Sequence, residues 1–93
     1  MAVPEPGSRI LRDPNVLAKR ADDQIVLVHL ETNRIFELNR TGAFLWDALA
    51  EPSSRAELEE RLALELDVDR EELAREIDEL RGQLMSERLV RAE

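Results

Sequence analysis

The chain has 93 residues, 43% of them hydrophobic and 37% charged, a composition that is typical of one small globular domain. It contains no cysteine and one histidine, which excludes disulfides, thiolate nucleophiles and zinc sites built from cysteines or several histidines. The formal net charge is −8, and residues 51–79 account for all of it. Because such an acidic stretch repels nucleic-acid phosphates, we do not expect a nucleic-acid partner.

The N-terminal part of the chain has little that would fold on its own. Residues 1–15 contain three of the four prolines and few apolar residues, so we expect a flexible N-terminal segment followed by one domain at 16–93. No apolar run approaches the roughly twenty residues of a membrane span, and no segment has the apolar stretch of a signal peptide. A cytoplasmic protein without a membrane partner is the expectation.

Three segments before residue 40 have the pattern of β-strands. Val16–Arg20 is a short candidate, and Gln24–Glu31 is the strongest because its bulky and β-branched residues leave little room for a polar face. A strand of this kind is expected to be covered on both sides. A tight turn at Thr32 and Asn33 leads into Arg34–Leu38, which predicts a three-stranded antiparallel meander.

The apolar pattern becomes helical after this third strand. Thr41 is the first candidate for the N-cap of a helix and Asn39 is the second, and Pro52 ends that helix. Capping boxes that begin at Ser54 and Asp69 predict two further helices. Their inward stripes are Leu58, Leu62 and Leu66, and then Leu73, Ile77, Leu80 and Leu84, and the pair Leu89 and Val90 closes the domain.

The residue types offer little to an enzyme. There is no tyrosine and no glycine-rich phosphate loop, and His29 lies in the most apolar strand, where a structural role is expected. Asp67 and Asp69 resemble part of a calcium loop but lack its glycine and its terminal glutamate. Trp46 shares a helix face with apolar residues and is expected in the core. The sequence therefore predicts a protein that is not an enzyme and has no cofactor or metal.

The order of elements predicts an α+β, winged-helix-like fold with a three-stranded antiparallel sheet followed by three helices. Many such domains bind DNA through the third helix, but here that helix carries more acidic than basic residues. Peptide binding along an unpaired edge of Arg34–Leu38 is the better interpretation. An acidic winged-helix regulator or adaptor that binds another protein or DNA is the alternative.

Several motifs together resemble the PqqD family. Its strand that ends in aromatic-x-Leu-Asn is matched by the run from Asn33 to Asn39, and its Thr-(Gly/Ala)-x-x-(Leu/Ile)-Trp helix by Thr41 to Trp46. The second-helix stripe and the Asp-Val link before the last helix follow in order, so the likeness covers Val16 to Val90. The chain departs from the family by carrying Asn33 and Glu51-Pro52 at two positions where glycine is frequent, and Phe36 in place of tyrosine.

This resemblance implies a recognition protein for ribosomally made, modified peptides. Such a protein holds the leader segment of a precursor peptide as an extra strand and presents it to a separate processing enzyme. A lasso-peptide leader peptidase is the first expectation for that enzyme, and a radical enzyme of the PqqD type is the second. The implied peptide-binding residues are Arg34, Ile35, Phe36, Glu37 and Leu38 on the strand, and Leu73, Arg75, Ile77, Asp78 and Glu79 on the third helix.

The ten residues are expected to play different parts. Ile35 and Glu37 are freer to contact a peptide than Phe36 and Leu38, which are expected in the core. On the third helix, the charged residues Arg75, Asp78 and Glu79 are expected to meet charged side chains of the leader. Leu73 and Ile77 are expected either to line an apolar pocket or to belong to the core.

Overall fold

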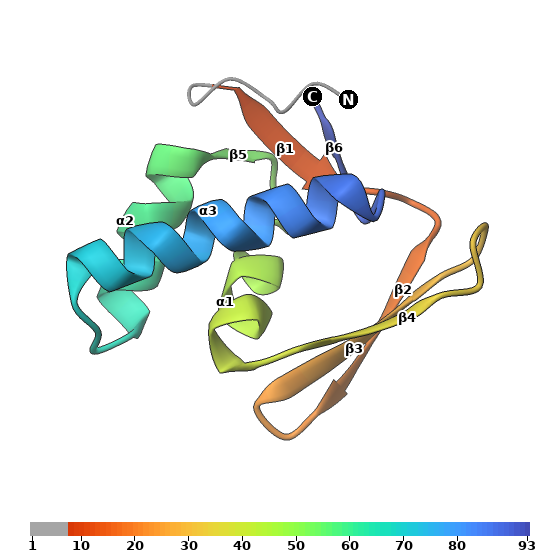
Figure 1. Cartoon of the computed structure of the whole chain (residues 1–93), viewed down its shortest axis with the longest axis horizontal. Coiled ribbons are helices and arrows are strands. Elements are labelled where there is room, and N and C mark those ends of the chain that lie inside the picture. The colour runs from red at the N-terminus through yellow and green to blue at the C-terminus, as the bar shows by residue number, and fades with distance from the viewer. Residues whose placement is uncertain (1–7) are drawn as a thin grey trace.

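The computed structural model describes residues 8–93 and contains three helices and two antiparallel sheets (Figure 1). One sheet has the order β2 (Val16–Ala21), β3 (Gln24–His29) and β4 (Ile35–Leu38). The other sheet has the order β5 (Ser53–Ser54), β1 (Arg9–Arg12) and β6 (Val90–Ala92). The helices are α1 (Arg40–Ala48), α2 (Arg55–Glu65) and α3 (Arg70–Ser86). The predicted α+β fold, with a three-stranded meander before three helices, is confirmed. No helix within residues 8–93 has the length and apolar content that crossing a membrane requires.

The two turns of the meander differ from each other. Asp22 and Asp23 connect β2 to β3 as a two-residue turn, with Asp22 at φ 59°. The predicted tight turn at Thr32 and Asn33 is wrong, because β3 ends at His29 and five residues separate it from β4. In this loop Asn33 has φ 61° and its N–H donates to the His29 carbonyl at 2.8 Å. Asparagine tolerates this left-handed conformation better than most residues, which accounts for its place here.

The central strand β3 packs on the helices through one face only. Ile25, Leu27 and His29 are buried, whereas Val26 and Val28 on the opposite face are half-buried. The expectation that both faces would be covered is therefore wrong. An antiparallel sheet can leave one face to solvent. The apolar run in β3 does not by itself show whether the second face of the strand is covered.

Side-chain caps start all three helices. Asn39, not Thr41, is the N-cap of α1, and its side-chain oxygen accepts the Gly42 N–H at 2.9 Å. The predicted capping box of α2 is complete, because Ser54 Oγ accepts the Glu57 N–H and Glu57 Oε1 accepts the Ser54 N–H. Asp69 caps α3 by accepting the Glu72 N–H at 3.3 Å. Of the predicted inward stripes, every residue is buried except Leu80, which is half-buried.

The second sheet was not expected from the sequence. Arg9–Arg12 lie within the segment 1–15 that was expected to be flexible, yet they form β1 between β5 and β6. Ile10 is fully buried, and its register partners are Ser53 and Ala92. Residues 1–7 of the expected flexible segment lie outside the described part of the chain. The reason for the difference is that β1 gains its hydrogen-bond partners from segments far away in the sequence.

Because Ile10 is buried, we expect it to contribute to the stability of the fold. Ile10→Ala should lower the free energy of unfolding by about 2–4 kcal/mol, because it leaves a cavity in the core. Urea unfolding followed by circular dichroism measures this change. Leu17→Ala is the matched control, since Leu17 is exposed, and it should shift the free energy by less than about 0.5 kcal/mol. Equal stability of the two variants would show that β1 does not belong to the folded core.

Candidate functional site

The strand β4 lies at an edge of its sheet. The sheet has the order β2, β3, β4, and within the described part of the chain no strand lies beyond β4. A strand edge presents unpaired N–H and C=O groups that an added strand can bond. The site is therefore built first from the main chain of β4.

The register shows which main-chain groups face outward. β3 and β4 pair Leu27 with Phe36 and Ile25 with Leu38, and the ladder continues in the bond from the His29 N–H to the Arg34 carbonyl at 3.0 Å. Hydrogen-bonded and non-bonded pairs alternate along an antiparallel ladder. His29 and Arg34 form a hydrogen-bonded pair, so every second pair from there is also hydrogen-bonded. The main-chain groups of Phe36 and Leu38 therefore face β3. Those of Ile35 and Glu37 face the open edge.

The side chains of β4 divide in the same alternation. Leu38 is buried and Phe36 is half-buried, and both pack on the core. Ile35 is 67% exposed, and Glu37 is also exposed. This confirms the expectation that Phe36 and Leu38 belong to the core. The side chains of Ile35 and Glu37 point to the opposite face of the sheet, and their main-chain groups face the open edge.

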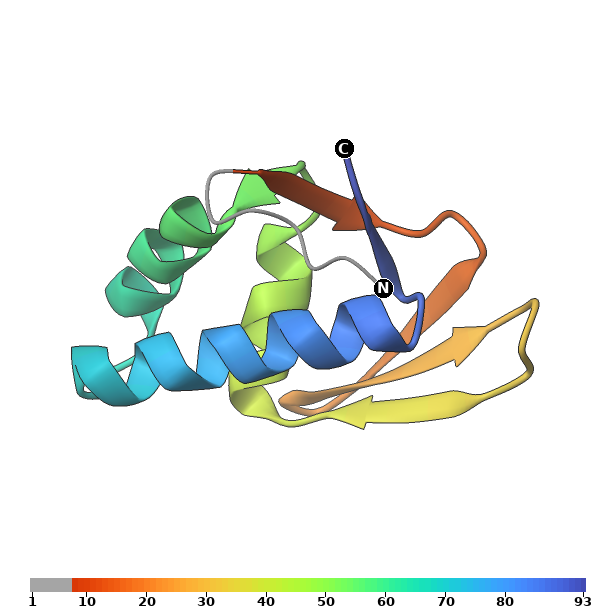
Figure 2. The same cartoon turned by 45° about the horizontal axis from the view of Figure 1, so that its top comes forward.

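The helix α3 runs along β4 in the opposite direction. At one end, Arg34 Nη1 lies 2.7 Å from Glu87 Oε2 at the C-cap of α3. At the other end, Asn39 and Thr41 share a cavity with Glu76 and Glu79. Eleven residues of helix and five residues of strand both span about 17 Å, so the two elements match in length over this stretch. Figure 2 shows α3 crossing α1 on its way to the end where β6 begins.

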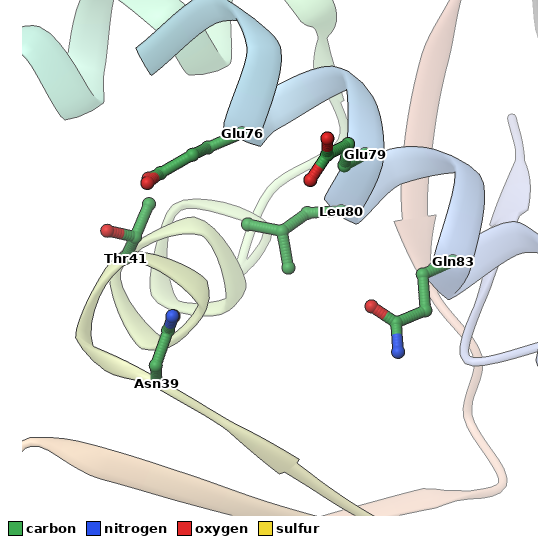
Figure 3. A pocket seen from close by; sticks show the side chains of 6 residues that line it. All are labelled: Asn39, Thr41, Glu76, Glu79, Leu80 and Gln83. Carbon is green, nitrogen blue, oxygen red and sulfur yellow. The ribbon is translucent and has the colours of Figure 1, made fainter. Parts of the chain in front are cut away.

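A cavity of about 250 Å³ lies between the start of α1 and α3, lined by Asn39, Thr41, Glu76, Glu79, Leu80 and Gln83. Figure 3 shows the side chains of Glu76, Leu80 and Gln83 projecting from α3 toward α1 and the strand that leads into it. Leu80 is the apolar residue of this lining, and the others carry carboxylate, amide or hydroxyl groups. The cavity can therefore hold a side chain that has both polar and apolar atoms.

The structure places the predicted residues of α3 on different sides of the helix. Leu73 and Ile77 are fully buried in the core, and of the three charged residues only Glu79 lines the cavity. Asp78 instead faces α2, where Arg55 Nε donates to its Oδ1 at 2.6 Å. This hydrogen bond is the main cause of a raised pKa at Arg55. Arg75 is exposed and does not line the cavity.

Sequence reasoning missed four polar residues of the lining, which are Asn39, Thr41, Glu76 and Gln83, and it assigned Leu80 to the core. A signal for the helical part was present, because Glu76, Leu80 and Gln83 are spaced i, i+4 and i+7 and so share one helix face. That face lies next to the core stripe. The spacing alone does not say whether this flank or the flank with Asp78 is turned toward β4.

The buried His29 has a structural role. Its Nε2 lies 3.1 Å from the Arg88 carbonyl and therefore donates, which leaves Nδ1 to accept the Glu31 N–H at 3.1 Å. Asp13, His29 and Glu31 lie close enough together to hold a cation. Because both ring nitrogens already have hydrogen-bond partners, the arrangement is explained without a metal.

The orientation of β4 can be tested without a ligand. Amide hydrogen exchange followed by NMR should show slow exchange at Phe36 and Leu38, whose N–H groups bond β3. Exchange should be much faster at Ile35 and Glu37, whose N–H groups face the open edge. If Ile35 and Glu37 were the protected pair, the assigned hydrogen-bonding pattern would be wrong and the open edge would present the main-chain groups of the other two residues.

Comparisons with known proteins support the fold and identify the family. The family model described as coenzyme PQQ synthesis protein D (PqqD) matches residues 24–90, well over half of the chain. No protein with a curated description matches this chain. A solved structure described as TbiB1 in complex with the TbiA(beta) leader peptide is 28% identical with a TM-score of 0.76, and the match covers 86% of this chain and 93% of that one.

A second structure, described as lasso peptide synthetase B1 complexed with the leader peptide, is 23% identical with a TM-score of 0.74. That match covers 88% of this chain and 96% of the other, and it supports the fold. The family match extends from the start of β3 to the start of β6, and so it includes β4, α3 and every residue of the cavity lining. The chain belongs to the PqqD family.

Proposed function

We propose that this protein binds the leader segment of a ribosomally made precursor peptide as an added strand on β4 and presents it to a separate processing enzyme. The observation that carries the proposal is the open edge of β4, where the main-chain groups of Ile35 and Glu37 point away from β3 beside α3. The similar structure at 28% identity, which contains a leader peptide, supports it.

Strand addition provides affinity that depends little on sequence, since every peptide carries the same main-chain groups. Selectivity must come from side chains next to the edge. Alternate residues of an added strand would point to the side on which α3 lies. There they would meet Glu76, Glu79 and Gln83, so we expect these three residues to read the leader, while the main-chain groups of Ile35 and Glu37 on β4 bind its backbone.

The proposal assigns no chemical step to the chain. Its one histidine is buried and bonded through both nitrogens, and its sequence has no cysteine or tyrosine. We infer a non-catalytic protein whose partner carries out the reaction. A leader peptidase of a lasso-peptide pathway is the proposed partner, and a radical enzyme of the PqqD type is the second choice.

The role of β4 is tested by removing single main-chain donors. Ile35→Pro and Glu37→Pro each delete an N–H at the open edge, so both variants should fold and bind the leader more weakly. Loss of one such bond should cost about 1–3 kcal/mol, or roughly one to two decades in affinity. Fluorescence polarisation with a labelled leader peptide, from a precursor gene first identified in the genomic neighbourhood of this protein's gene, measures the affinity.

Two controls make this test specific. Phe36→Pro should reduce folding as seen by circular dichroism, because its N–H bonds β3 within the ladder. Arg75→Ala should bind the leader like the unchanged protein, since Arg75 is exposed away from the cavity. If the two edge variants kept full affinity while Arg75→Ala lost it, the peptide would bind to the helix and not as a strand.

The lack of a catalytic step is tested separately. The purified chain incubated with its precursor peptide should leave the peptide unchanged, and adding the partner enzyme should start processing. Mass spectrometry of the peptide distinguishes the two results. Cleavage or modification by the chain alone would refute the recognition role even if the leader bound as a strand.

A further inference from the structure

The face of the β2–β3–β4 sheet that points away from the helices is unusually apolar. Its exposed large residues are Leu17 on β2, Leu30 after β3 and Ile35 on β4, which are 57%, 52% and 67% exposed. Val26 and Val28 lie between them on β3 and are half-buried. We call this surface the outer face. An antiparallel sheet with a solvated face normally alternates apolar and polar residues, so the outer face has the composition of an interface.

The register arranges these residues in two rows across the sheet. One row is Leu17, Val28 and Ile35, and the next is Lys19, Val26 and Glu37. Directly opposed residues in neighbouring strands lie on the same face, so each row is a continuous line of side chains. The first row is entirely apolar. The second carries a cation at the β2 end and an anion at the β4 end.

The two charges of the second row have no ion-pair partner within residues 8–93. Lys19 and Glu37 lie on strands two positions apart, about 9.6 Å between main chains, and neither forms an ion pair with any described residue. The sequence thus places one positive and one negative charge at opposite ends of one row, beside an apolar row. When the second row is turned end for end and laid on an identical row, each cation meets an anion. The first row treated in the same way sets apolar residues against apolar residues.

We propose that the outer face binds the outer face of a second copy of this chain. A two-fold axis parallel to β3 would lay β2 of each copy over β4 of the other. This operation sets Leu17 against Ile35 of the second copy and Lys19 against Glu37 of the second copy, twice over. Such isologous contacts are the usual basis of homodimers, and nearly aligned strands are one of the two usual ways in which sheets pack.

The size of the surface sets the strength of the association. Three strands of up to six residues each give a footprint of about 20 Å by 14 Å, which is a flat area of roughly 300 Å² without the added surface of the side chains. Standard interfaces bury about 800 Å² per partner, so the dimer is weak and forms only at high protein concentration. The open edge of β4 stays outside the contact, so a dimer and an added strand on β4 are compatible.

Sedimentation equilibrium from micromolar to millimolar protein tests the proposal. The unchanged chain should associate to a dimer and no further. Leu17→Lys should raise the dimer dissociation constant by about tenfold or more, because it places a charge in the apolar row. Leu64→Lys is the matched control, since Leu64 on α2 is 86% exposed but is not part of the outer face, and its dimerisation should be unchanged.

Charge exchange identifies the second copy as the partner. Lys19→Glu or Glu37→Lys alone makes both intermolecular charge pairs repulsive, so each variant should dimerise roughly tenfold more weakly. In an equimolar mixture of the two variants, both pairs are again opposite in sign, and dimerisation should be restored. A chain that stays monomeric at every concentration, or a mixture no stronger than its components, would overturn the proposal. Loss of partner-enzyme processing in Leu17→Lys without any dimer would assign the outer face to that enzyme.

Discussion

The abrupt turn from β4 into α1 determines the shape of the site. Asn39 ends the strand and caps the helix, accepting the Gly42 N–H at 2.9 Å, and the Ala43 N–H bonds the Asn39 carbonyl at 2.7 Å. A Cβ atom at residue 42 would lie 3.0 Å from Cβ of Leu38, so glycine allows the first helical turn to pack tightly on the end of the strand. Because the chain leaves β4 at once, the open edge ends beside the cavity.

The helix α1 then connects the two sheets. Trp46 is buried, and Arg12 from β1 donates through Nε to the Trp46 carbonyl at 3.0 Å with its guanidinium 5.1 Å from the ring centroid. Burial lowers the pKa of Arg12, but it remains charged because arginine titrates far above neutral pH. From the other sheet, Arg20 on β2 pairs with Asp47 at 2.7 Å. Both sheets are therefore positioned relative to α1, and through α1 relative to the cavity between α1 and α3.

Local rules explain what could be predicted from the sequence. The Ser54 capping box and the period-two pattern before Asn39 act between residues a few positions apart, so they identify α2 and the meander. The strand Arg9–Arg12 could not be found in this way, since its pairing with Val90–Ala92 depends on segments at opposite ends of the chain. A four-residue strand with one buried residue carries too little local signal of its own.

The candidate site was predictable in part for the same reason. The edge of β4 follows from strand order, and the alternation of Phe36 and Leu38 with Ile35 and Glu37 follows from strand geometry. The flank of α3 that lines the cavity depends on how the helix is rotated about its axis. That rotation is set by packing of Leu73 and Ile77 on the core and by Arg55, which binds Asp78 from α2. Three charged residues near each other in sequence thus separate, and only Glu79 reaches the cavity.

The ion pair between Arg34 and Glu87 links the start of β4 to the end of α3, yet it would be a weak barrier to a strand added on the open edge. Arg34 is largely exposed, and exposed pairs contribute about 0.2–1 kcal/mol. Main-chain hydrogen bonds from a strand added at Ile35 and Glu37 would outweigh that cost, since each contributes about 0.5–1.5 kcal/mol net. A peptide on β4 can therefore displace Arg34 without a large penalty. The guanidinium carbon also lies 5.2 Å from the centroid of the Phe36 ring, a cation–π contact that does not depend on Glu87.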